Sequence, residues 1–169
     1  MKRLINLAVV ILAAIALLSN AACKPYLEKL DEESKKKQIS ADINDRVEEL
    51  MQNAKVFAQS ESYKLAAEEY RTIIADYPEF GAIAEVYYNL SQMQLAMDDR
   101  DAQIKTLHEV TARIPNHSRA LFDLSEAYFS KGNYAKAEEF ALLARDASPD
   151  DTAPVQLLER IRSKRQGLD

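Results

Sequence analysis

The stretch that decides the fold of this chain is SRALFDLSEAYFSKGNYAKAEEFALLARDASPD, residues 118–150. Its first part repeats apolar and small residues three and four positions apart, which places them on one face of a helix: Leu121, Leu124, Ser125 and Tyr128. Gly132 then breaks the pattern, because glycine readily adopts the left-handed backbone of a tight turn. A second helical face follows and ends before Pro149: Tyr134, Ala137, Ala141 and Ala144. The stretch therefore predicts two helices joined by a tight turn.

Two earlier blocks carry the same pattern. Prolines mark the period, since Pro78, Pro115 and Pro149 are 37 and 34 residues apart and each follows a helical pattern. The first block begins near Val47 and the second near Ala84. Their apolar faces comprise Leu50, Ala54, Phe57, Tyr63, Ala66, Tyr70 and Ile73 in the first block and Tyr87, Leu90, Ser91 and Leu107 in the second. A pattern that recurs at this period predicts a stack of similar helix pairs.

The blocks resemble the tetratricopeptide repeat, a helix-turn-helix unit of about 34 residues. Ser125, Tyr128, Gly132 and Ala137 fall at that family's spacing. The earlier blocks depart from the family pattern at Asn53, Glu61, Gln94, Asp98 and Gln103, and three residues are inserted at 80–82. The resemblance implies an all-α solenoid of three units, at residues 47–80, 84–117 and 118–151.

Residues 152–169 predict one more helix, which closes the stack. Asp151 or Thr152 can cap its start, and Pro154 suits its first turn. We expect an apolar stripe of Val155, Leu158 and Ile161. The rest of the helix is basic, through Arg160, Arg162, Lys164 and Arg165. A capping helix with a basic tail is the favoured interpretation, and a tail that docks a peptide is the alternative.

The first 22 residues have the organisation of a secretory signal peptide. Two basic residues follow Met1, residues 4–18 contain Asn6 as their single polar residue, and small residues precede Cys23. A membrane span needs about 20 apolar residues, and this apolar core is shorter. The segment therefore favours export with cleavage over a permanent anchor.

Cys23 is the single cysteine of the chain, so it has no internal disulfide partner. The residues before it resemble the signal of bacterial lipoproteins, in which a cysteine after small residues is lipid-modified and becomes the new N-terminus. Ala21 and Ala22 match that signal, whereas Asn20 departs from it. The resemblance implies lipidation of Cys23, for example with palmitate, and Lys24 in place of an aspartate implies sorting to the outer membrane, facing the periplasm. A soluble periplasmic protein and an inner-membrane anchor are the alternatives.

A charged tether and an acidic body follow the cysteine. Residues 24–39, KPYLEKLDEESKKKQI, favour a solvated spacer with local helix formation. Residues 40–151 carry 11 Lys and Arg against 21 Asp and Glu. This acidic balance argues against a nucleic acid partner, because phosphate binding needs a basic surface.

The resemblance also implies where a partner would bind. The first helices of stacked units line the concave side, and five positions of each unit face that groove in the family. Here those positions are Glu48, Met51, Lys55, Ala58 and Gln59, then Glu85, Tyr88, Gln92, Leu95 and Ala96, then Arg119, Phe122, Glu126, Phe129 and Ser130. We expect an apolar strip of Tyr88, Leu95, Phe122 and Phe129, edged by charges. Its occupant is a partner protein or peptide, the chain's own ends, or a second copy.

Some tetratricopeptide proteins bind a C-terminal carboxylate through cationic and amide side chains in this groove. Asn89 and Arg119 match that set, whereas Met51, Lys55 and Asp123 stand where the family has a lysine, an asparagine and a cation. Because the Asp123 carboxylate would repel a bound carboxylate, this clamp is not expected.

The sequence indicates no catalytic chemistry. His108 and His117 lack further ligands at metal-site spacing, and there is no glycine-rich phosphate loop and no GxSxG motif. We predict a non-catalytic scaffold, without cofactor or metal, that binds envelope proteins or peptides. Lipoproteins of this architecture serve outer-membrane assembly, pilus or secretion systems and cell-wall complexes. The alternatives are a self-assembling structural protein, including a homodimer, and a carrier of a small apolar ligand.

Overall fold

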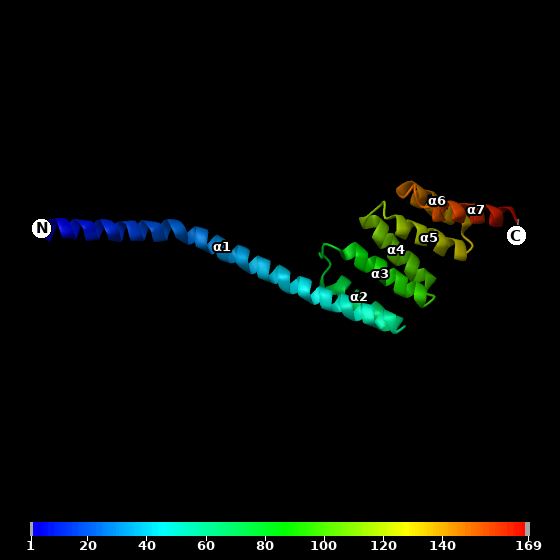
Figure 1. Cartoon of the computed structure of the whole chain (residues 1–169), viewed down its shortest axis with the longest axis horizontal. Coiled ribbons are helices and arrows are strands. Elements are labelled where there is room, and N and C mark those ends of the chain that lie inside the picture. Colours follow the sequence, from blue (N-terminus) through cyan, green and yellow to red (C-terminus); the bar gives the residue numbers. More distant parts are fainter. Residues whose placement is uncertain (1, 168–169) are drawn as a thin grey trace. The chain divides into compact units, whose positions relative to one another are not determined.

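The computed structural model describes residues 2–167 and the side chains of residues 28–167. This part of the chain contains seven α-helices and no strand (Figure 1), which confirms the predicted all-α class. The helices are α1 (Lys2–Gln59), α2 (Tyr63–Asp76), α3 (Ile83–Ala96), α4 (Arg100–Arg113), α5 (Ser118–Ser130), α6 (Tyr134–Ala147) and α7 (Ala153–Gln166). Two units are compact by themselves, residues 1–46 and residues 47–169.

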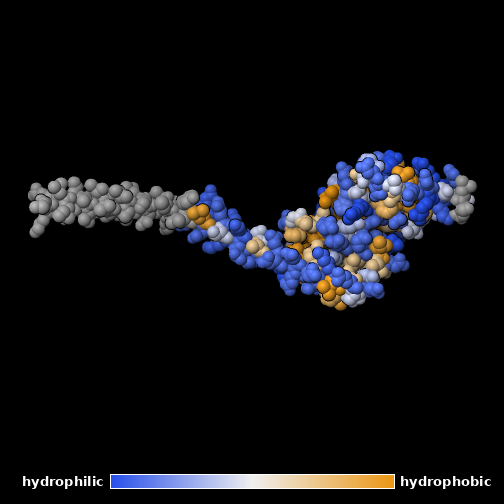
Figure 2. Space-filling view, in the orientation of Figure 1, coloured by the Kyte–Doolittle hydropathy of each residue, from blue (hydrophilic) through white to orange (hydrophobic). Residues whose placement is uncertain are grey.

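In the first unit, residues 28–46 are helical and every one of their side chains is exposed. The surface is mostly hydrophilic with separate apolar spots (Figure 2), and its large apolar side chains are Leu30, Ile39 and Ile43. Gln38 Nε2 donates to Asp42 Oδ1 at 2.8 Å, a contact between neighbouring helical turns. The predicted tether, residues 24–39, is thus helical throughout and not only locally.

The predictions of a signal peptide and of a lipidated Cys23 concern residues 1–24, whose side chains lie outside the described part of the chain. They stay predictions. Among the described residues, no helix combines the length and the hydropathy of a membrane span.

In the second unit, three helix pairs turn back in the same way. The pairs are α1 with α2, α3 with α4, and α5 with α6, and the turn residues Glu61, Asp98 and Gly132 have left-handed φ angles of 58°, 58° and 72°. The predicted left-handed turn at Gly132 is confirmed. At the other two turns a residue with a side chain holds this conformation, which is disfavoured for every residue except glycine.

The second helix of each pair ends as the prolines predict. Helices α2, α4 and α6 end at Asp76, Arg113 and Ala147, each two residues before Pro78, Pro115 or Pro149. Proline cannot continue a helix, and it also restricts the residue before it.

Two apolar clusters form the core. The first lies on α1, α2 and α3 and comprises Val47, Leu50, Ala54, Ala66, Ala67, Tyr70, Ile73, Val86 and Leu90. The second lies on α4 to α7 and comprises Leu107, Val110, Ala120, Leu124, Tyr128, Ala137, Ala141, Leu157, Leu158 and Ile161. The faces that the sequence patterns predict supply most of both clusters, so helical spacing is what determines the core.

The N-terminal side of the stack has a polar surface. Val86 and Leu90 on α3 and Leu124 on α5 are buried where one helix pair packs on the previous one. One unit length earlier, α1 carries Glu49 and Asn53 at the corresponding positions. The first pair is therefore built as the end of a stack.

The C-terminal side is closed by α7. Pro154, Leu157, Leu158 and Ile161 are its buried residues, whereas Val155 is 41% exposed. The expected stripe was wrong at this residue, because the helical face centred on Leu157 and Leu158 includes position 154 and turns position 155 outward. At the start of the helix, Asp151 supplies the cap, since its Oδ1 accepts from the Ala153 amide at 2.9 Å.

Basic residues of α7 pair with neighbouring helices. Arg160 lies 3.8 Å from Glu126 on α5, and Arg162 lies 3.8 Å from Glu138 on α6. Arg165 also pairs with Glu138. These contacts hold the basic face of α7 against the stack.

Candidate partner-binding groove

The predicted groove residues lie on the first helices of the three pairs. Those on α3 and α5 include exposed charges and half-buried apolar or polar side chains: Glu85 and Arg119 are exposed, and Tyr88, Gln92, Leu95, Phe122, Glu126 and Phe129 are half-buried. Tyr88, Phe122 and Phe129 pack against the second apolar cluster. The predicted strip is therefore partly covered by its own neighbours and partly accessible to solvent.

Asp123 links α3 to α5 within this surface. Its Oδ2 accepts from Gln92 Nε2 at 2.8 Å, and the Tyr88 hydroxyl is close enough for Asp123 to affect its ionisation. The Tyr88 ring lies 5.0 Å from the His117 ring, centroid to centroid. Side chains of the second and third helix pairs thus meet at this carboxylate.

Burial governs the ionisation of this group. It raises the pKa of Asp123 above the usual carboxyl value, although the hydrogen bonds from Gln92 and Tyr88 and the nearby His117 and Arg119 act in the opposite direction. Burial and the Asp123 carboxylate also raise the pKa of Tyr88 to about 12. At neutral pH the tyrosine is therefore protonated, so its hydroxyl can donate to the Asp123 carboxylate.

Next to Asp123 lies a pocket of about 220 Å³. It is lined by Leu95, Arg100, Gln103, Asp123, Glu126, Phe129, Ser130 and Arg160. Two cations, two acids and two apolar side chains face the same space. A pocket with this lining suits a peptide segment with both polar and apolar groups better than a wholly apolar molecule.

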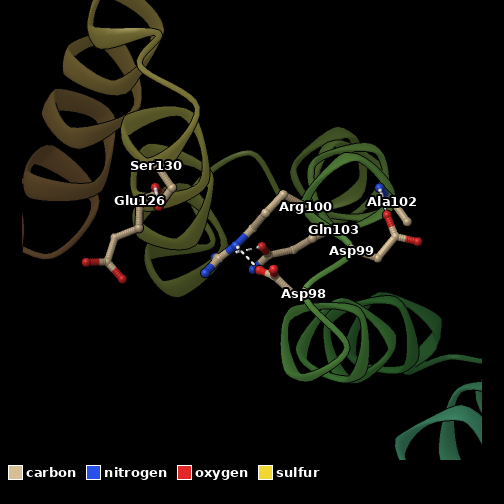
Figure 3. A network of polar contacts seen from close by, with 7 residues as sticks. All are labelled: Asp98, Asp99, Arg100, Ala102, Gln103, Glu126 and Ser130. Atoms are coloured by element: carbon tan, nitrogen blue, oxygen red, sulfur yellow. Dashed lines mark hydrogen bonds and ion pairs between the residues drawn. The ribbon is translucent and has the colours of Figure 1, made fainter.

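Arg100 enters this space from the start of α4. Figure 3 shows its guanidinium group between the α3–α4 turn and α5, where Glu126 and Ser130 lie. Its contacts are long, because Nη1 lies 3.3 Å from Gln103 Oε1 and Nε lies 3.7 Å from Asp98 Oδ1. A partner's carbonyl or carboxylate oxygen at hydrogen-bond distance would improve on both contacts.

Arg160 closes the other end of the pocket. Its guanidinium carbon lies 5.0 Å from the centroid of the Phe129 ring, so this cation from α7 covers the end of the apolar strip. Cation–π contacts of this kind are worth about 0.5–1 kcal/mol at exposed sites. Part of the groove is therefore occupied by the chain's own C-terminal helix.

The structure divides the predicted site residues into two groups. Leu95, Glu126 and Phe129 share the pocket, and Tyr88 and Gln92 meet at Asp123. On α1, Met51 packs against the first apolar cluster and Lys55 is exposed, and neither lines the pocket. The groove described here belongs to α3, α4, α5 and α7.

Sequence reasoning missed four residues of this site: Asp123 as a hydrogen-bond centre, Arg100, Gln103 and Arg160. The repeat period contains a signal for one of them. Arg160 stands 34 residues after Glu126, a predicted groove residue, so α7 presents it where a further unit would present its own groove residue. Arg100 and Gln103 belong to a second helix, and no rule for first helices finds them.

The two histidines have structural partners. His117 Nδ1 accepts from the Ala120 amide at 3.1 Å and so caps α5. His108 Nε2 lies 3.1 Å from the Tyr128 hydroxyl. Among the described residues, no group of three or more His, Cys, Asp or Glu side chains is arranged to hold a metal ion.

Comparison with known proteins identifies the fold. Residues 95–161 match the tetratricopeptide repeat family model, while a comparison with curated protein sequences gives no match. The MamA structure from Desulfovibrio magneticus RS-1 (from residue 41 on) is 20% identical, with a TM-score of 0.65 and coverage of 72% of this chain and 67% of that chain. The type III secretion chaperone SycD of Yersinia enterocolitica, in complex with a peptide of the translocator YopD, is 22% identical, with a TM-score of 0.65 and coverage of 72% and 95%.

The Sgt2 tetratricopeptide domain from Aspergillus fumigatus is a third neighbour, 19% identical, with a TM-score of 0.63 and coverage of 72% of this chain and 80% of that chain. Identities this low show a shared fold and no more. The chain therefore has the all-α solenoid fold of these neighbours, and its residues 95–161 match the tetratricopeptide repeat family model.

Proposed function

We propose that this protein is a non-catalytic scaffold that binds a peptide segment of a partner protein in the groove of α3, α4, α5 and α7. The observation that carries the proposal is the pocket beside Asp123, where apolar and charged side chains from four helices face one space. The SycD neighbour supports it, because that structure holds a translocator peptide on the same fold.

The lining predicts the kind of segment that binds. Leu95 and Phe129 can contact one apolar side chain of the bound segment, while Arg100 and Ser130 can form hydrogen bonds with the main-chain or polar groups of that segment. Cations and acids balance within the pocket, so we expect binding to depend more on apolar contact than on net charge. The alternative of a small apolar ligand receives no support from this lining.

The groove is tested by site-specific photo-crosslinking in the producing cell, with the photoreactive amino acid at position 129 or at position 143. Leu143 lies on α6, away from the groove residues, and is 46% exposed. We expect position 129 to give discrete crosslinked species that contain another protein, and position 143 to give none of these. Leu95→Arg should remove the species formed from position 129, whereas Leu143→Arg should leave them intact.

Two outcomes would contradict the scaffold proposal. Equal crosslinking from both positions would mean that the groove is not selective. Crosslinks only to a second copy of the chain would instead favour the self-assembling structural protein.

We further propose that the chain is an exported lipoprotein, held in the outer membrane by acylated Cys23 and facing the periplasm. The support is in the sequence: a signal-like segment, small residues before the cysteine and no second cysteine. Labelling with a palmitate analogue and membrane fractionation test it. Cys23→Ser should lose the label and leave the membrane fraction, with Ser19→Ala as the matched control. Retention of the Cys23→Ser protein in membranes at high salt would show that lipid is not the anchor.

A further inference from the structure

The second helix pair buries polar side chains beside its apolar ones. Five buried polar residues are found among the described residues, and four of them lie on α3 and α4. We call these four, Ser91, Gln94, Gln103 and Thr106, the polar seam. The apolar cluster on α1 to α3 ends on one side of it, and the cluster on α4 to α7 begins on the other.

Hydrogen bonds do little to join the two sides of the polar seam. Ser91 Oγ donates to the Tyr88 carbonyl of its own helix at 2.6 Å, and Gln103 Oε1 accepts from Arg100 of its own helix. Gln94 Oε1 is buried and has no partner among the described residues. A buried polar atom without a partner disfavours the closed packing.

The third helix pair shows what the second one lacks. Ser125 corresponds to Ser91, and its Oγ donates across the pair to the Ala137 carbonyl at 2.7 Å. This buried bond ties α5 to α6. In the second pair the equivalent serine bonds within α3 and leaves the interface with α4 without this tie.

Two further features bear on the same interface. The α3–α4 turn passes through Asp98 in a left-handed conformation, which an aspartate tolerates less well than glycine. Beyond the turn, Gln92 of α3 is bonded to Asp123 of α5, a polar and half-exposed contact that water can replace. The apolar contact of α3 with the second cluster is made by Tyr87 and Tyr88, which are only half-buried.

We propose that the repeat domain opens at the polar seam, with residues 47–96 and residues 100–166 as separate cooperative units and the turn at 97–99 as the hinge. Opening changes the width of the groove, because the pocket lining includes residues of both units. Leu95 belongs to the unit before the hinge, and Arg100 and Gln103 belong to the unit after it. The inference does not depend on the proposed function.

Hydrogen–deuterium exchange of the full chain, followed by mass spectrometry at low urea concentrations, tests the proposal. We expect amides of α2 and α3 to exchange together, about tenfold or more faster than those of α5 and α6, as sub-global opening requires. We expect the residues before the seam to open first, because α7 covers the other end of the repeat unit whereas the end formed by α1 is polar. A single exchange rate shared by α2 to α6 would overturn the proposal.

A repacked seam provides the second measurement. Gln94→Tyr combined with Gln103→Ala copies the pair Tyr128 and Ala137 from the third helix pair, and replaces two medium side chains by one large and one small. We expect exchange in α3 to slow about tenfold, toward the rate of α5, because the unpaired oxygen is removed. Gln52→Tyr, the same change at an exposed position of α1, should leave the difference in exchange rate between α2–α3 and α5–α6 unchanged. If the repacked variant keeps native helicity and the difference persists, the seam is not the cause.

Discussion

The second and third helix pairs share a length, a turn and a proline, yet their interiors differ. The equivalent positions are Ser91 and Ser125, Gln94 and Tyr128, and Gln103 and Ala137. In the third pair an aromatic ring, a small residue and a cross-helix hydrogen bond fill the interface. In the second pair two buried amides take the place of the ring and the small residue. The comparison shows that helix spacing is enough for the fold, while the residues at a few interface positions decide how firmly each pair closes.

The largest effect should come from truncating the core of the third pair. Leu124 is fully buried in the second apolar cluster, and Leu124→Ala should destabilise the domain by about 3 kcal/mol through lost contacts and a cavity. Leu90→Ala, the equivalent change in the second pair, should cost less, about 2 kcal/mol, because the neighbouring interface already buries an unpaired oxygen of Gln94. Urea denaturation monitored by circular dichroism measures both. A larger loss for Leu90→Ala would contradict the comparison.

The serines test the hydrogen bond directly. Ser125→Ala removes the bond to the Ala137 carbonyl and should cost about 1 kcal/mol. Ser91→Ala removes only a bond within one helix turn, so we expect a change close to zero. Urea denaturation measures both variants. Equal losses in the free energy of unfolding would mean that the cross-helix bond stabilises the third pair no more than a bond within one helix does.

Substitutions at the two turns should change the stability by smaller amounts and in opposite directions. Gly132 and Asp98 both have positive φ angles, and a Cβ added to Gly132 would meet no atom within 4 Å. Gly132→Ala should therefore cost about 1 kcal/mol through backbone strain alone, and Asp98→Gly should stabilise by about 0.5 kcal/mol. Thermal unfolding followed by circular dichroism measures both shifts. A lower midpoint for Asp98→Gly would show that its contact with Arg100 outweighs the strain.

The smallest effect concerns pH at the junction of the two pairs. Burial, and then Lys136, lower the pKa of His108 below its usual value, while Glu139 acts in the opposite direction. The neutral ring is thus favoured in the folded state. The neutral His108 ring contributes to the free energy of unfolding fully above the pKa of the unfolded state, about 6.5. This contribution is lost as pH falls through the lower pKa of the folded state. Between pH 7.5 and 5.5 the wild-type unfolding midpoint should fall more than that of His108→Gln, and parallel curves would rule this out.

The architecture was predictable because it depends on periodic positions. The faces of α5 and α6, the left-handed Gly132 and the three prolines follow from spacing that the sequence displays directly. The expected stripe of α7 was one position off at Val155, since adjacent helical faces differ by a small rotation. Among the groove residues, Tyr88 and Phe129 were found through the repeat.

The rest of the site depends on contacts that no single helix encodes. Asp123 becomes a hydrogen-bond centre only because α3 packs beside α5, and Arg100 reaches the pocket from a second helix. The unpaired oxygen of Gln94 likewise follows from packing. The sequence does show departures from the repeat pattern at Gln94, Asp98 and Gln103, which lie at the polar seam and its turn. It does not indicate their effect on the packing of α3 against α4.

The polar N-terminal face of α1 and the charged C-terminal helix α7 have a consequence for stoichiometry. Since Glu49 and Asn53 replace the apolar residues that join one pair to the next, and α7 covers the opposite side, chains cannot extend one another into longer arrays by the contacts that join their own repeats. Each chain then offers one groove of fixed length. If each groove binds one partner segment, as proposed, the number of segments bound is set by how many chains the cell makes, so expression level becomes the direct control of recruitment.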